Sequence, residues 1–149
     1  MKQLYDGATP SGNSVALQVL LWLSRLTNQP EYEQMATQMT KTFAEEIEAA
    51  PEAYAFFLSA LDFQIGPSYS VTVVGDLKED DTQGMLRTIR QNYLQTIVTV
   101  LRHPDKAGLS YKQVEGKATA YVCRDQTCLP PTNSPTVMLE QLGVKQEKH

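Results

Sequence analysis

Two cysteines near the end of the chain are the residues best suited to covalent chemistry. Cys123 and Cys128 are separated by four residues, so a turn between them would allow a disulfide. The alternative, which we favour, is a pair of structural thiols at the end of a strand, because buried cysteine behaves as a small hydrophobic residue. A redox role would instead need an exposed thiolate of lowered pKa. No metal or cofactor is expected. Zinc sites commonly use two close pairs of ligands, and the only pair here is the two cysteines, because His103 and His149 lie far from them along the chain.

A polar loop before the first apolar run is the best candidate for binding a ligand. Its acidic residue could accept hydrogen bonds from hydroxyl groups, or move a proton if its pKa were raised. Backbone N–H groups at the start of a following helix could bind an anion. Turn formation and helix capping explain the same residues without a ligand, and we favour capping, although the two roles are compatible. The candidate ligand-binding residues are Asp6, Gly7, Ser11, Gly12 and Asn13.

An acidic cluster and a histidine complete the candidates. The cluster follows a short β-branched run and suits a solvated helix start, where the helix dipole favours negative charge. It would repel a phosphate group, and His103 is expected to be a surface residue without a partner. No complete set for general acid–base catalysis is present, so the catalytic residues stay unknown and enzymatic activity stays uncertain. The cluster consists of Asp76, Glu79, Asp80 and Asp81.

The first half of the chain must position the loop, and its pattern is helical. Residues 15–26 and 53–63 are apolar on nearly all sides, which is typical of helices buried on every face. Between them, after Pro30, apolar residues follow a single stripe, which indicates an outer helix exposed on one side. Large aromatic residues in these helices could stack on a sugar, but we favour a role in the core. The expected cap of the first helix is Ser11, Asn13 or Ser14.

The second half of the chain must position the cysteines and the acidic cluster, and it reads as a small α/β unit. Residues 70–75, 96–101 and 118–123 are β-branched runs, each typical of a strand. Helical spacing between the first two strands, continuing to Tyr93, predicts a parallel crossover. A last short helix is expected within residues 132–142, capped by Asn133 or Ser134. The fold class is therefore α+β, with three strands expected.

Composition and charge exclude several classes of partner. The net charge is −4 and the pI about 5.1, so the basic surface that nucleic acid requires is missing. No apolar run approaches the ~20 residues that span a membrane. Without a signal peptide, the expected location is the cytoplasm, where cysteines are mostly reduced.

Three stretches of this sequence resemble one protein family along nearly the whole chain. They are YDGATPSGNS at residues 5–14, VTVVG at 71–75, and ATAYVC at 118–123 followed by Cys128 and Pro130. They are similar to the C-terminal end of the spermatogenesis-associated protein 20 family of thioredoxin-domain-containing proteins. The resemblance implies a six-hairpin barrel, an α/α toroid like those of glycosidases and N-acylglucosamine 2-epimerases, and a small carbohydrate-like ligand. The family's thioredoxin-type cysteine pair does not map onto this chain.

The resemblance and the helical pattern together predict the organisation of the chain. Residues 1–66 would be the last hairpins of a partial toroid, residues 67–144 the α/β unit, and residues 145–149 a frayed tail. Two helices that are apolar on all sides cannot both be covered by so short a chain. We therefore expect self-association, or packing against upstream domains, and no activity from the chain alone.

Overall fold

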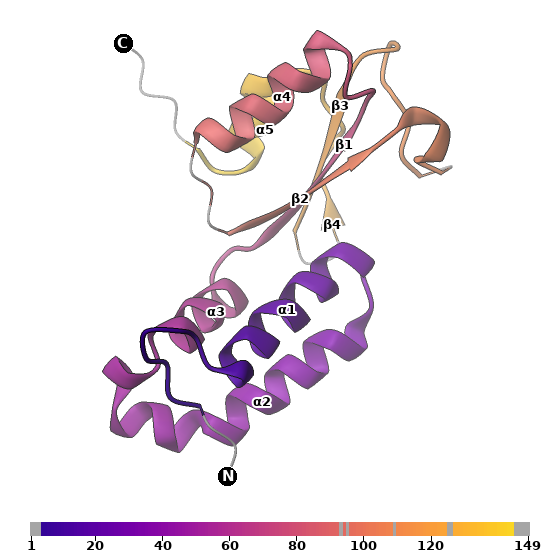
Figure 1. Cartoon of the computed structure of the whole chain (residues 1–149). Helices are drawn as coiled ribbons and strands as arrows, with labels where there is room; N and C mark the ends of the chain where they lie inside the picture. The colour runs from indigo at the N-terminus through magenta and orange to yellow at the C-terminus, as the bar shows by residue number, and fades with distance from the viewer. Residues whose placement is uncertain (1–3, 93, 95, 109, 125–126, 145–149) are drawn as a thin grey trace. The chain divides into compact units, whose positions relative to one another are not determined.

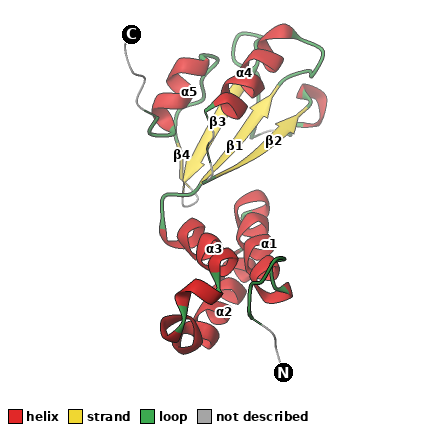
Figure 2. Cartoon of the chain, turned by 60° about the vertical axis from the view of Figure 1, so that its left-hand side comes forward, coloured by secondary structure: helices red, strands yellow, loops and turns green. Residues whose placement is uncertain are grey.

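The structure is a computed structural model that describes residues 4–92, 94, 96–108, 110–124 and 127–144. The predicted frayed tail and Tyr93 lie outside the described residues. The fold class is α+β, as predicted, and the described residues form five α-helices and a four-stranded mixed sheet. The chain divides into two compact units, Met1–Pro67 and Ser68–His149, which Figures 1 and 2 show as a helical unit and a sheet unit. Among the described residues, no helix combines the length and apolar character needed to cross a membrane.

Local sequence signals set the limits of the first two helices. The Ser11 side chain accepts a hydrogen bond from the Ser14 backbone N–H and caps α1, Gly12–Thr27, so one of the three predicted caps is confirmed. Asn28 ends α1 in the left-handed conformation, with φ of 57°. Pro30 then occupies the first turn of α2, Pro30–Ala49, where its missing N–H costs nothing.

The third helix begins later than predicted. Pro51 opens a single 3₁₀ turn, Pro51–Ala53, rather than an α-helix. Tyr54 then leaves helical geometry, with φ of −132° and ψ of 40°, and α3 covers Ala55–Ile65. The predicted run at residues 53–63 therefore starts too early, because Ala53 belongs to the 3₁₀ turn and Tyr54 is not helical.

The core of the helical unit lies between one face of α1 and both other helices. Leu17 and Leu21 of α1 are fully buried, and so is Phe57 of α3. The rings of Phe43 in α2 and Phe57 meet edge to face, with centroids 6.1 Å apart. Tyr54, Phe57 and Phe63 are buried, as a core role predicts, and Phe56 is half-buried. The same prediction was wrong for Trp22, which is 46% exposed.

The sheet has the strand order β2-β1-β3-β4. Strand β1, Tyr69–Val74, pairs in parallel with β2, Ile97–Arg102, and α4, Asp80–Gln91, connects them, so the predicted crossover is confirmed. Strand β3, Thr119–Arg124, lies antiparallel to β1 on its other side. The prediction missed β4, Thr127–Cys128, because a two-residue strand carries no periodicity.

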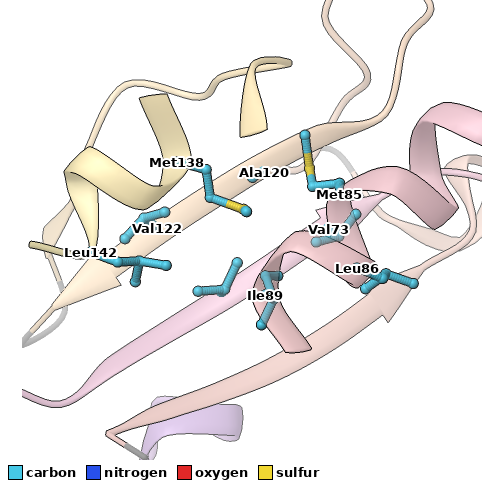
Figure 3. Packing of buried hydrophobic residues seen from close by; sticks show 9 residues of the cluster. Val73, Met85, Leu86, Ile89, Ala120, Val122, Met138 and Leu142 are labelled. Carbon is cyan, nitrogen blue, oxygen red and sulfur yellow. The ribbon is translucent and has the colours of Figure 1, made fainter. Parts of the chain in front are cut away.

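The core of the sheet unit fills one face of the sheet. Helix α4 and the last helix, α5, Pro135–Gln141, both cover this face, and α5 is capped by Ser134, one of its two predicted caps. Figure 3 shows side chains of both helices meeting those of β1 and β3. The buried cluster consists of Val71, Val73, Met85, Leu86, Ile89, Ala120, Val122, Met138 and Leu142.

Candidate functional site

The carboxylate of Asp6 joins the N-terminal loop to the start of α3. Its Oδ1 accepts a hydrogen bond of 2.7 Å from the Ser11 backbone N–H, and its Oδ2 accepts one of 2.9 Å from the Phe57 backbone N–H. The Asp6 backbone N–H donates to the Ala53 carbonyl at 2.9 Å. Because Phe57 is 51 residues away along the chain, this one side chain fixes the loop and supplies a cap to a distant helix.

The electrostatics of Asp6 favour its ionised form. Burial alone would raise the pKa of the Asp6 carboxyl, but the hydrogen bonds from the Ser11 and Phe57 backbone N–H groups outweigh it. The net result is a pKa below the ordinary value of 3.8. A general acid or base at neutral pH needs a raised pKa, so this shift favours a structural anion over proton transfer.

The remaining loop residues differ in their surroundings. Ser11 is buried and acts as the α1 cap, Asn13 is half-buried, and Gly7 and Gly12 are exposed. These residues therefore lie around one turn at the start of α1, with the polar groups of Asp6 and Ser11 already hydrogen-bonded to the protein. The contact with a carbohydrate-like ligand stays a prediction.

Helix α1 exposes an apolar stripe on the side away from its buried residues. Val15, Val19, Trp22 and Leu26 are 42%, 41%, 46% and 39% exposed, and we call these four residues the α1 seam. Their spacing of four, three and four residues follows the 3.5-residue repeat by which helices pack along one another. The prediction that α1 is buried on every side was therefore wrong for the side that carries the seam, and the expected self-association stays a prediction.

A second polar region lies where the parallel strands of the sheet end. A pocket of about 510 Å³ opens there, beside the acidic cluster at the start of α4. His103 lies between two carboxylates, with Nε2 3.7 Å from Asp76 Oδ2 and Nδ1 3.5 Å from Asp105 Oδ2. The prediction that His103 has no partner was wrong. Asp76 follows β1 and His103 follows β2, and the parallel pairing of these strands brings the two residues to the same edge of the sheet. The nine residues that line the pocket are Asp76, Glu79, Asp80, Asp81, His103, Pro104, Asp105, Gln113 and Gly116.

Asp81 is the most constrained member of the acidic cluster. Its Oδ2 accepts a hydrogen bond of 2.7 Å from the Ala118 backbone N–H, and its Oδ1 accepts one of 2.7 Å from the Thr82 backbone N–H. The Ala118 bond is the main reason why the pKa of Asp81 lies below 3.8, against a smaller opposing effect of burial. Within the described residues, no three acidic, cysteine or histidine side chains converge closely enough to hold a metal ion. The carboxylates of this pocket would attract a cation and repel a phosphate, but the carboxylate of Asp81 is already hydrogen-bonded to the backbone of Thr82 and Ala118.

The two cysteines are bonded to each other, so the expectation of free thiols was wrong. Cys123 of β3 pairs directly with Cys128 of β4, and their Cα atoms are 3.9 Å apart. The hairpin that brings them together depends on β4, which the sequence pattern did not reveal. Cys128 is exposed and Cys123 is half-buried. The available signal was the spacing of four intervening residues, which allows a hairpin with directly opposed cysteines.

Comparison with known proteins gives relatives of greater length. Human spermatogenesis-associated protein 20 is 28% identical to this chain over 144 residues, and the rat and mouse proteins are 28% and 26% identical. Each alignment covers 91% of this chain and 18% of the relative. An uncharacterised protein of Caenorhabditis elegans is 29% identical over 136 residues, which is 87% of this chain. No family model and no solved structure matches. The chain is thus homologous to spermatogenesis-associated protein 20, and it spans 18% of the length of these relatives.

Proposed function

We propose that the helical unit is a docking module that packs through the α1 seam against another apolar helix. The observation that carries this proposal is the 4-3-4 spacing of four exposed apolar residues on one face of α1. Covering the exposed part of each side chain would contribute roughly 1 kcal/mol, since burial of a whole large apolar side chain is worth about 1.5–3 kcal/mol. The interaction energy available is therefore that of a short helix–helix contact.

The occupant of the seam differs with the length of the polypeptide. In the chain by itself, the matching apolar helix is the α1 seam of a second copy, which gives self-association. In a polypeptide as long as the relatives, a neighbouring helix of the same chain would fill this place. That arrangement corresponds to α1, α2 and α3 forming part of a larger ring of helices, the partial toroid that the resemblance implies. The proposed role is structural, with catalysis left to other parts of such a protein.

The oligomeric state of the chain, measured over a concentration series, tests the proposal. Trp22 is the only tryptophan of the sequence and belongs to the seam, so its fluorescence reports directly on this face. We expect sedimentation velocity to show a dimer at high concentration, and the Trp22 emission to shift to shorter wavelength as the dimer forms. A chain that remains a monomer at every concentration would contradict the proposal.

A pair of charge substitutions separates the seam from general effects of charge. Val19→Glu places a carboxylate in the middle of the seam and is expected to abolish association while leaving Trp22 in place as the reporter. Gln38→Glu adds the same charge at an exposed position of α2 and should leave association unchanged. Equal behaviour of the two variants would mean that another surface drives association.

A further inference from the structure

We propose that the Cys123–Cys128 disulfide is a thiol–disulfide exchange site, which a dithiol reductant opens by attack at Cys128. Its location in the sheet unit makes this inference independent of helix docking. The bond joins β3 to β4 at the edge of the sheet, where Cys123 and Cys128 stand directly opposite each other.

Access to the two sulfur-bearing residues is unequal. Cys128 is exposed, and its neighbours Thr127, Leu129 and Pro130 are exposed as well. Cys123 is half-buried within the longer strand β3. Because exchange requires an attacking thiolate to reach one sulfur along the S–S axis, Cys128 is the attacked residue and Cys123 the leaving group.

The bond adds little that the sheet does not already provide. It closes a loop with a sequence separation of only 5, and disulfides that close short loops remove the least entropy from the unfolded chain. Backbone hydrogen bonds from Leu129 and Thr132, which follow β4, already attach this part of the chain to Val122 and Ala120 of β3. The Leu129 N–H donates to the Val122 carbonyl at 2.9 Å, and Ala120 and Thr132 exchange bonds of 2.7 Å and 3.0 Å. A staple is therefore redundant here, which favours a chemical role.

Opening the bond also leaves the core of the sheet unit in place. Side chains alternate along a strand, and Ala120 and Val122 of β3 point into the buried cluster. Cys123 therefore projects to the opposite face. Reduction changes an edge of the sheet without removing a member of the core, as a reversible site requires.

The exchange is balanced with a dithiol as the co-reactant. One thiolate of the dithiol bonds to Cys128 Sγ, the S–S bond breaks, and the electron pair leaves on Cys123 Sγ, which takes up a proton. The second thiol loses its proton and attacks the dithiol's own sulfur in the mixed disulfide, which releases Cys128 as a thiolate that is then protonated. The protein disulfide gains two electrons and two protons, and the dithiol becomes a disulfide.

Reduction kinetics of the full chain test this assignment. The chain is treated with dithiothreitol, then quenched, alkylated and weighed by mass spectrometry, both in native buffer and in urea. We expect native reduction to be within about tenfold of the rate in urea, because exposure controls access to the bond. The far-UV circular dichroism of the reduced chain should match that of the oxidised chain. Native protection far beyond tenfold, or loss of the sheet signal on reduction, would overturn the proposal.

Single serine variants compare how accessible each sulfur is, the property on which the choice of Cys128 as the attacked residue depends. With oxidised glutathione, Cys123→Ser should form a mixed disulfide at the exposed Cys128, and Cys128→Ser should form one at Cys123 about tenfold more slowly, because access limits the rate. The two variants serve as controls for each other, since each retains one thiol. Equal rates, or the reverse order, would contradict attack at Cys128.

Discussion

The helical unit and the sheet unit use their apolar helix faces differently. In the sheet unit, α4 and α5 pack Met85, Leu86, Ile89 and Met138 into the buried cluster of the sheet, while Val137 of α5 is 40% exposed. In the helical unit, α1 buries Leu17 and Leu21 but exposes the seam on its other side. The sheet has a second layer that covers its core, whereas three helices can cover only one side of α1. The sheet unit therefore buries one apolar face of its sheet by itself, whereas the helical unit leaves the α1 seam exposed.

In both units, an aspartate carboxylate connects segments that are distant along the chain. Asp6 and Asp81 each accept two backbone hydrogen bonds, one from a nearby residue and one from a distant segment. The distant donors are Phe57 and Ala118, which are 51 and 37 residues away along the chain. Each carboxylate thereby connects the start of a helix to a strand or loop that no local interaction would place there.

The largest effect is expected on the buried face of α1. Leu21→Ala should lower the free energy of unfolding by about 2–5 kcal/mol, because Leu21 is fully buried and its truncation leaves a cavity. Val19→Ala, two residues away in the seam, should change it by about 0.5 kcal/mol or less, as is usual for exposed positions. Urea unfolding of the chain as a dilute monomer, followed by Trp22 fluorescence, measures both. Similar losses for the two variants would mean that the seam is covered within the single chain.

Two glycines of the sheet unit should respond in opposite directions to the same substitution. A Cβ at Gly75 would collide with Thr82 Oγ1 and lie 3.1 Å from Thr82 Cβ and Cγ2, so Gly75→Ala should cost about 1–3 kcal/mol. Gly84 lies within α4 with nothing within 4 Å of an added Cβ. Gly84→Ala should therefore stabilise the unit by up to ~1 kcal/mol, the helix propensity difference. Thermal unfolding by circular dichroism tests both, and a stable Gly75→Ala protein would show that β1 and α4 are not in close contact.

Asp6→Asn tests the role of the Asp6 carboxylate through the pH dependence of the free energy of unfolding. The folded pKa of Asp6 lies below 3.8, so its contribution to stability is fully present above the unfolded value and is lost as the pH falls through the folded value. An amide cannot accept both backbone hydrogen bonds, so the variant should lose about 1–2 kcal/mol at pH 7.

The difference between wild type and Asp6→Asn should begin to shrink below about pH 4, where the carboxyl of the unfolded chain takes up a proton, and should be lost once the pH falls below the lower pKa of the folded carboxyl. Urea unfolding at a series of pH values measures it, and a difference that stays constant down to pH 2 would refute the assignment. Asp81→Asn should behave in the same way with a smaller loss, because Asp81 is exposed.

The smallest effect is expected at the ion pair between α1 and α2. Arg25 Nη1 and Glu33 Oε2 are 2.8 Å apart, beside the turn that joins the two helices. Glu33→Gln should cost about 0.2–1 kcal/mol, the usual range for pairs that solvent can reach. The loss should diminish in 1 M salt, where charges are screened within ~3 Å. A loss that salt does not affect would indicate a packing role for Glu33 instead.

The sequence by itself determined the elements whose signals are local. Ser11, Pro30 and Ser134 mark helix starts through interactions within one turn, and the β-branched runs mark three of the four strands. The crossover between β1 and β2 followed from the short segment that joins them. The apolar pattern of residues 15–26 also predicted apolar side chains on every side of α1, including the side that the structure leaves exposed.

Only the tertiary structure decided which distant residues meet. The bond from Phe57 to Asp6, the position of His103 between Asp76 and Asp105, and the pairing of the cysteines all depend on how elements pack or pair. The Phe57–Asp6 and His103–Asp76 contacts join segments that are far apart along the chain, so no local pattern encodes them. The spacing of the cysteines allowed their bond, but the register of β3 and β4 decided it. The same packing selected which side of α1 is buried, and so which four residues form the seam.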